Sequence, residues 1–106
     1  MEASLRIAEA ADATALNRAL ARLSADLGDT HAVSDETLAR AGWEAPPAFR
    51  AVLAERGAEI LGLALCSPCF STTRGGAGIF VSDLWAAPEA RGQGLGRRLL
   101  AAALED

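Results

Sequence analysis

The stretch SDLWAAPEARGQGLGRRLL, residues 82–100, joins an apolar strand to a leucine-rich helix through a loop of glycines and arginines. The first-turn amides of a helix lack partners within the helix, and the helix dipole places partial positive charge there. Glycines leave those amides accessible, and Arg91, Arg97 and Arg98 add formal charge. The stretch therefore predicts a cradle for a phosphate or pyrophosphate group. The alternative is a strand-to-helix turn that holds no ligand.

Two common phosphate-binding loops do not fit this stretch. A Walker A loop needs a lysine after its last glycine, whereas Arg97 follows Gly96 and the chain has no lysine. The dinucleotide-binding loop has the spacing G-x-G-x-x-G, but Gly92, Gly94 and Gly96 are spaced G-x-G-x-G. The cradle is therefore of another kind.

The strand before the loop, IFVSDLWAA at residues 79–87, is apolar on both of its faces. By alternation, positions 79, 81, 83 and 85 share one face and positions 80, 82, 84 and 86 share the other. Such a strand is typical of the interior of a sheet that is covered on both sides. Asp83 is the exception, because burial raises the pKa of a carboxyl group without a positive partner. Asp83 is therefore a candidate functional residue; the alternative is a structural carboxylate bonded to loop amides.

Upstream of these residues the chain predicts a short strand and two helices. The segment SLRIAEA, residues 4–10, alternates apolar and polar side chains as a strand does. Asp12 is the expected N-cap of a helix whose leucines share one face and which ends at Gly28. Ser34 is the expected start of a shorter helix that stops at Gly42.

Three strands are expected in the second half of the chain. AFRAVLAE at residues 48–55 and EILGLAL at residues 59–65 have the spacing of a hairpin. A glycine-rich turn, STTRGGAG at residues 71–78, then leads into strand 79–87. The element order predicts the α/β (α+β) class, with a mixed, mainly antiparallel sheet flanked by helices.

Length and charge limit the function. A chain of 106 residues is enough for one domain. The net charge of −4, with ten acids against six arginines in residues 1–59, disfavours nucleic-acid binding. No apolar run is long enough to span a membrane, and the N-terminus lacks the order of a signal peptide. We expect a soluble, cytoplasmic protein.

Two cysteines and one histidine are the remaining candidates for chemistry. Cys66 and Cys69 have the C-x-x-C spacing of redox pairs, but they interrupt a strand instead of opening a helix. We interpret them as ordinary strand cysteines beside a bulge marked by Pro68; a redox pair is the alternative. A zinc site needs more ligands than these and His31 supply, so no metal is expected. His31 is expected to be an exposed loop residue, or else to face a substrate.

The pattern R-x-x-G-x-G formed by Arg91, Gly94 and Gly96, after an apolar strand and before a leucine-rich helix, resembles the GNAT superfamily of N-acetyltransferases. The order of elements along the whole chain is similar to that family too. Residues 70–100 look like the diamine and polyamine acetyltransferase branch, in which this strand carries a pair of acids. Asp83 lies at the second acid of that pair, whereas Ser82 departs from the first.

The resemblance implies an enzyme that transfers an acetyl group from acetyl-CoA to a primary amine of a small molecule by direct attack. It implies that the backbone of Leu84, Trp85 and Ala86 binds the pantetheine arm. Asp83 is the expected catalytic residue, which binds or helps to deprotonate the amine. The remaining residues expected to bind acetyl-CoA are Arg91, Gly92, Gln93, Gly94, Leu95, Gly96 and Arg97.

In the family, the signature helix is followed by a further strand and helix, which are not found in residues 1–106. The resemblance therefore predicts a single GNAT domain that lacks its C-terminal portion. Without the following strand, strand 79–87 would keep an open edge, which predicts instability or a homodimer. An inactive fragment that binds acetyl-CoA, or a dimerising remnant of such an enzyme, is the alternative function.

Overall fold

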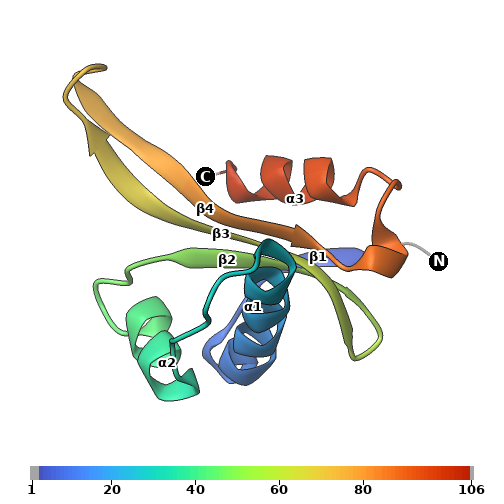
Figure 1. Ribbon diagram of the computed structural model, residues 1–106. Helices are drawn as coiled ribbons and strands as arrows, with labels where there is room; N and C mark the ends of the chain where they lie inside the picture. The colour runs from blue at the N-terminus through green and yellow to red at the C-terminus, as the bar shows by residue number, and fades with distance from the viewer. Residues whose placement is uncertain (1–2, 106) are drawn as a thin grey trace.

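A computed structural model describes residues 3–105 of the protein and has helices on both faces of a single sheet (Figure 1). In chain order the strands and helices are β1 (Ser4–Ile7), α1 (Ala13–Leu27), α2 (Asp35–Trp43), β2 (Arg50–Arg56), β3 (Glu59–Ser71), β4 (Gly76–Ala86) and α3 (Leu95–Ala103). Two short 3-10 turns, η1 (Ala10–Asp12) and η2 (Pro88–Ala90), precede α1 and α3. The order agrees with the α+β class expected from the sequence.

The sheet has the strand order β1-β2-β3-β4, and each neighbouring pair is antiparallel. Helices α1 and α2 cover one face and α3 covers the other (Figure 1). The sequence predicted a mixed, mainly antiparallel sheet, and all strand pairs within the described residues are antiparallel. The loop between β4 and α3 lies at one end of the sheet.

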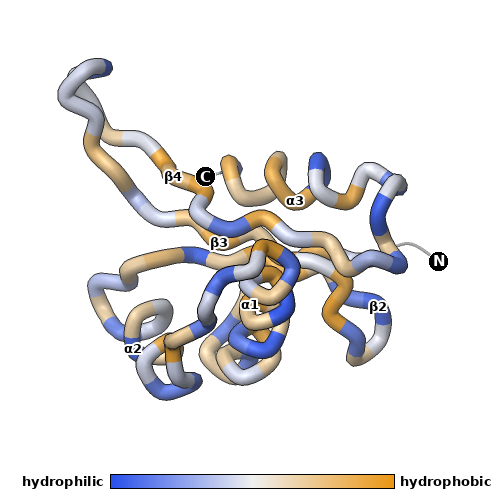
Figure 2. The backbone as a smooth tube through the Cα atoms, viewed as in Figure 1, coloured by the Kyte–Doolittle hydropathy of each residue, from blue (hydrophilic) through white to orange (hydrophobic). Residues whose placement is uncertain are grey.

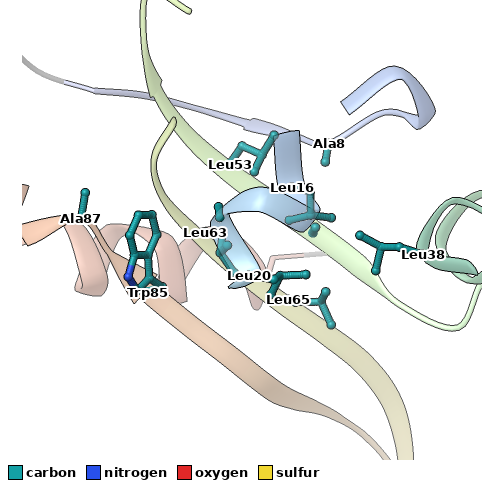
Figure 3. Packing of buried hydrophobic residues seen from close by; sticks show 11 residues of the cluster. Ala8, Leu16, Leu20, Leu38, Leu53, Leu63, Leu65, Trp85 and Ala87 are labelled. Atoms are coloured by element: carbon teal, nitrogen blue, oxygen red, sulfur yellow. The ribbon is translucent and has the colours of Figure 1, made fainter. Parts of the chain in front are cut away.

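The larger hydrophobic core lies between the sheet and α1. Leu16 and Leu20 of α1 pack in one cluster with Leu63 and Leu65 of β3 (Figure 3). The one-face spacing of the leucines in α1 produces this contact, because residues three or four apart meet the same surface. Trp85 of β4 closes the cluster beside α1.

Helix α3 packs closely on the opposite face of the sheet. Leu95, Leu99 and Ala103 form one buried stripe of this helix, as their spacing predicts. The helix approaches the sheet over Gly62 of β3. A Cβ atom at that position would lie 2.8 Å from the carbonyl oxygen of Trp85 and 2.9 Å from Leu99 Cδ1. Because Gly62 has no side chain, α3 can pack this close to β3.

The helix ends differ from the sequence-based expectation in two places. Ser34 caps α2 by accepting a hydrogen bond from Thr37 N–H at 3.1 Å, as expected. Asp12, however, makes no side-chain cap to α1, because its carboxylate pairs with Arg6 at 2.7 Å. Gly42 does not end α2, which continues to Trp43.

Strands β3 and β4 are longer than expected and extend beyond the helices as an arm (Figure 1). Polar residues mark the tip of the arm, and apolar ones lie along its length (Figure 2). Among residues 3–105, β4 is the edge strand, so the expected open edge is present, whereas the interior position expected from its two apolar faces is not. Its Ile79, Phe80 and Leu84 side chains are exposed to 42%, 58% and 41%.

Cys66 and Cys69 are both unpaired strand residues of β3. Cys66 is buried between β2 and the end of α3, where its thiol faces the carbonyl oxygens of Arg50 and Ala103. Cys69 is exposed on the arm. Among residues 3–105, no helix has the length and apolar character that crossing a membrane requires.

Candidate functional site

A bulge in β4 determines where Asp83 points. Asp83 pairs with Leu65 of β3, whereas the next β3 residue, Cys66, pairs with Val81, so Ser82 is an extra residue in β4. Simple alternation predicts that Val81 and Asp83 share a face, and that expectation is wrong. Val81 packs on the α3 side, whereas Asp83 lines a cavity on the α1 and α2 side.

The carboxylate of Asp83 is partly exposed and not buried as the sequence suggested. Its Oδ2 atom accepts a hydrogen bond from the Ser82 hydroxyl at 2.9 Å. It makes no contact with an amide of the following loop among the hydrogen bonds of the described residues, which disfavours the structural alternative. The carboxylate therefore faces the cavity with an oxygen free for a ligand.

The open edge of β4 offers backbone groups beside the bulge. In an antiparallel pair, alternate residues direct their N–H and C=O groups toward the partner strand. Ala87 N–H donates to Leu61 C=O at 2.8 Å, and Trp85 lies opposite Leu63 in the same register. The backbone of Trp85 therefore faces β3, whereas that of Leu84 and Ala86 faces the open edge. The sequence of this strand alone does not show which of Leu84, Trp85 and Ala86 presents its backbone groups to the open edge, because that depends on how β4 pairs with β3.

The loop after β4 leads into α3 through two glycines in the left-handed region. Gly92 and Gly94 have φ angles of 81° and 77°, which only glycine adopts readily. The first helical bond of α3 at this end runs from Arg98 N–H to Gly94 C=O. The amides of Leu95, Gly96 and Arg97 therefore have no helical partner.

Gly96 has no role in the packing of the protein. It lies within α3 without a positive φ, and a Cβ atom there would have nothing within 4 Å. Glycine in a helix costs about 1 kcal/mol relative to alanine. The fold itself does not require this cost, and the bare backbone leaves room over the first-turn amides.

Arg91 holds the loop in place by its contacts. Its Nε donates to the carbonyl oxygen of Ala86 at 2.9 Å, and its guanidinium pairs with Asp26 of α1 at 2.9 Å. Asp26 Oδ2 also accepts from Trp85 Nε1 at 3.1 Å. The Trp85 hydrogen bond, together with Arg91, lowers the pKa of Asp26 below its ordinary value. The charge of Arg91 is thus shared with Asp26, a partner that no local pattern in the sequence indicated.

The other two arginines of the loop differ in their contacts. Arg98 donates to the carbonyl oxygen of Ala3 at 3.0 Å, near the start of β1. Arg97 is exposed and makes no ion pair with any residue from 3 to 105. Gln93 is also exposed in the loop. Among residues 3–105, Arg91 is therefore the one of the three arginines that an acid neutralises, whereas Arg97 and Arg98 form no ion pair.

His31 lies beside the same cavity as Asp83, although the two residues are far apart in sequence. Its ring is held between Asn17 and Ser24 of α1, at 2.6 Å and 3.3 Å. It is therefore not a free loop residue. The sequence indicated His31 as a candidate but gave no sign of Asn17. In residues 3–105, no group of three His, Cys, Asp or Glu side chains is arranged to hold a metal ion.

The family model described as the acetyltransferase (GNAT) family matches residues 13–106. No curated protein sequence matches the chain. An integron cassette protein, HFX_CASS3, from the mobile metagenome of Cole Harbour Salt Marsh is 29% identical, with a TM-score of 0.76. That match covers 92% of this chain and 65% of the cassette protein.

Two further solved structures share the fold at lower identity. An aminoglycoside acetyltransferase, HMB0005, from a soil metagenomic sample is 18% identical with a TM-score of 0.76, over 96% of this chain and 69% of its own. A predicted acetyltransferase with acetyl-CoA from Clostridium acetobutylicum is 19% identical with a TM-score of 0.77. That match covers 95% of this chain and 70% of the Clostridium protein. The chain thus spans about two thirds of the length of each of these proteins.

Proposed function

The chain belongs to the GNAT acetyltransferase family, and from this premise we propose that it transfers an acetyl group from acetyl-CoA to a primary amine of a small molecule. The observation that carries the proposal is the bare first turn of α3. Gly96 is a glycine that neither its backbone angles nor its neighbours require. It is explained by a ligand that lies over the amides.

In this proposal the pyrophosphate of acetyl-CoA binds at the loop between β4 and α3. The free amides of Leu95, Gly96 and Arg97 donate to its oxygens, and the dipole of α3 favours its charge. The backbone of the loop, at Gly92, Gln93 and Gly94, lies beside these amides at the start of α3. Arg91 acts differently from the expectation, because it fixes the loop to β4 and α1 through Ala86 and Asp26.

The pantetheine arm would lie along the open edge of β4. Leu84 directs its N–H and C=O to that edge, and Ala86 directs its N–H there. An arm bound in this way acts as an added strand. The Leu84 amide, next to the bulge, is then the donor that meets the oxygen of the thioester carbonyl, where negative charge develops during attack.

Asp83 would hold the acceptor amine on the cavity side of β4. A primary amine has a pKa of about 10 and is mostly protonated at neutral pH, so it must lose a proton before attack. The carboxylate binds the ammonium form and helps to remove that proton. A C–N bond then forms at the acetyl carbon as the C–S bond breaks. The first proton passes from the ammonium to Asp83 and on to solvent. After the attack the nitrogen loses a second proton, which goes to the thiolate, so that the products are the amide and coenzyme A.

The cradle is tested by Gly96→Glu. The Cβ position is open and the backbone angle is ordinary, so the variant can fold, and an acid in the first turn favours the helix. We expect it to lose acetyl-CoA binding in a calorimetric titration, because a carboxylate then occupies the anion site. Ala101→Glu, an exposed position of the same helix, carries the same charge change and is expected to bind as the wild type does.

Two outcomes would contradict the proposal. Equal affinity of the wild type and Gly96→Glu would remove the pyrophosphate from this loop. A folded wild-type chain that does not bind acetyl-CoA at all would favour the alternative reading, a remnant without the activity.

A second candidate function, self-association, is favoured by the edge of β4. This strand has no neighbour on its outer side among residues 3–105, and Ile79 and Phe80 are exposed there. We propose that a second copy covers the part of this edge around Ile79 and Phe80 as a homodimer, since unpaired edges with apolar side chains favour pairing, and that Leu84 and Ala86 stay open to the pantetheine arm. The proposal also includes a cytoplasmic location, with which the unpaired Cys66 and Cys69 are compatible.

A further inference from the structure

A cavity of about 310 Å³ lies between the sheet and the two helices that cover it on the Asp83 side. Small-molecule sites have volumes of about 300–1,000 Å³, so the cavity is at the lower end of that range. Its lining consists of Leu20, Ser24, His31, Val33, Thr37, Leu38, Ala41, Phe49, Leu65 and Asp83. The side chains therefore come from α1, α2, the loop between them, and the sheet.

The lining is apolar except at a few positions. Leu20 and Leu65, which belong to the large core cluster shown in Figure 3, are among the lining residues. Leu38 of α2 and Phe49 line it from the side of α2 and β2. Asp83 is the one charged side chain in the lining that the structure describes. The cavity thus offers one site for a cation and an apolar space around it.

The histidine of the lining is fixed in one orientation. Asn17 Nδ2 donates to Asp35 Oδ1 at 2.7 Å and to Val33 C=O at 3.1 Å. These two acceptors identify the other atom of the amide as the oxygen, which lies 2.6 Å from His31 Nε2. Nε2 must therefore donate a hydrogen bond to Asn17. In the neutral ring, Nδ1 then accepts from the Ser24 hydroxyl at 3.3 Å.

Both nitrogens of His31 are therefore used by α1, and neither is left for a substrate. What the ring offers to the cavity is its aromatic surface. Asn17 is buried, 9% exposed, and its amide joins His31 to Asp35 at the start of α2. The network thus builds a rigid wall from the loop between α1 and α2, in which Asn17 is a positioning residue.

We propose that this cavity takes a monoamine with a compact apolar body, such as an arylalkyl or branched alkyl amine. The amine group meets Asp83 and the apolar body lies among Leu20, Leu38 and Leu65, against the ring of His31. This inference rests on the acetyltransferase function proposed above and specifies its acceptor. It differs from the polyamine that the sequence resemblance implied.

The charge count of the lining decides between these acceptor classes. A polyamine or an aminoglycoside carries several ammonium groups, and each one in an apolar cavity needs a partner. The described lining provides one carboxylate, on Asp83. A second ammonium would find only the neutral oxygens of Ser24 and Thr37 besides the His31 ring in this lining, and these do not balance its charge. A monoamine has no such group, and its apolar body gains from leaving water.

The first test compares acceptors in a coupled assay of coenzyme A release. We expect phenethylamine and isoamylamine to have kcat/KM values about tenfold or more above those of spermidine and kanamycin, because the apolar body is buried on binding. A higher kcat/KM for spermidine or kanamycin would overturn the inference while leaving the acetyltransferase function intact.

The second test fills the cavity with Ala41→Leu. Ala41 is a partly buried lining residue of α2, and the added methyls occupy space that the apolar body needs. We expect KM for phenethylamine to rise about tenfold while KM for methylamine, which lacks an apolar body, changes little. Ala101→Leu on α3 is the matched control. Equal KM values for phenethylamine in the wild type and Ala41→Leu would overturn the inference.

A chain that acetylates no amine would count against the proposed function, and binding then tests the cavity directly. Phenethylamine is titrated into the methyl-labelled protein, and NMR shifts are followed at Leu20, Leu38 and Leu65. Saturable shifts in the wild type that weaken in Ala41→Leu support the cavity as an apolar amine site. Absence of saturable shifts in the folded wild type overturns it.

Discussion

Arg6 and Asp12 show how a single ion pair replaced an expected helix cap. Arg6 donates to Asp12 at 2.7 Å and to Glu55 at 2.8 Å, so it ties β1 to both η1 and β2. The hydrogen bonds from Arg6 are the main cause that lowers the pKa of Asp12 from 3.8 to about 2. The carboxylate of Asp12 is therefore stabilised in its charged form in the folded protein.

Asp12→Asn should lower the free energy of unfolding at neutral pH by about 1–2 kcal/mol, after a discount for solvent around Arg6. The pKa of Asp12 is lowered on folding, so its contribution is complete above pH 3.8 and is lost as the pH falls toward 2. Urea unfolding from pH 7 to pH 3 should show the difference in free energy of unfolding between the wild type and the variant becoming smaller toward the acidic end.

Asp29→Asn, at an exposed loop position without an ion pair among residues 3–105, is the control for this experiment. A difference between the wild type and Asp12→Asn that stays constant down to pH 3 would mean that the ion pair with Arg6 does not contribute.

At the scale of elements, the contact of α3 with β3 is set by one missing side chain. Gly62 lies under Leu95 and Leu99, and a Cβ atom there would also meet the carbonyl oxygen of Trp85. A backbone atom cannot rotate away as a flexible side chain does. The strand or the helix has to move if the position is filled.

Gly62→Ala should therefore destabilise the protein by about 1–3 kcal/mol, as overpacking of a core does. The same movement shifts the first turn of α3, so weaker acetyl-CoA binding should accompany the loss. Chemical denaturation and calorimetry on one preparation measure both effects.

Gly78→Ala provides the comparison within β4. A Cβ atom at Gly78 would meet Cys69 Sγ at 3.6 Å, which is ordinary contact. Its expected effect is between neutral and a gain of about 1 kcal/mol, since alanine restricts the unfolded chain. A Gly62→Ala variant as stable as Gly78→Ala would show that α3 does not pack tightly on β3.

At the scale of the whole molecule, β4 has no neighbouring strand on one side among residues 3–105, and its Ile79 and Phe80 side chains are exposed. Apolar residues lie along the arm that β3 and β4 form (Figure 2). We expect the weight-average mass in sedimentation velocity to rise with concentration, as copies pair along this edge. Phe80→Lys places a charge on the arm and should shift the protein toward the monomer.

Leu27→Lys is the matched control, because Leu27 is an exposed apolar residue at the end of α1 and not on β4. A wild-type chain that stays monomeric at all concentrations would remove the homodimer from the proposal. Equal association of Phe80→Lys and Leu27→Lys would place the contact elsewhere on the molecule.

Local patterns in the sequence were enough to predict the element order. The spacing of apolar residues indicated α1 and α3, and the glycines after β4 indicated the loop. These features depend on neighbours a few residues away, so a single sequence contains the information. The same patterns placed Asp83 at the centre of the expected site, although they described it as buried.

Only the tertiary structure decided how the site is built. Ser82 forms a bulge because β4 pairs with β3, and that pairing turns Asp83 toward the cavity. Asp26 meets Arg91 across 65 residues of sequence, and His31 meets the cavity that Asp83 lines. No local pattern specifies such contacts, since each depends on how two distant elements pack. The sequence thus determined which elements form, whereas packing determined which side chains meet at the site.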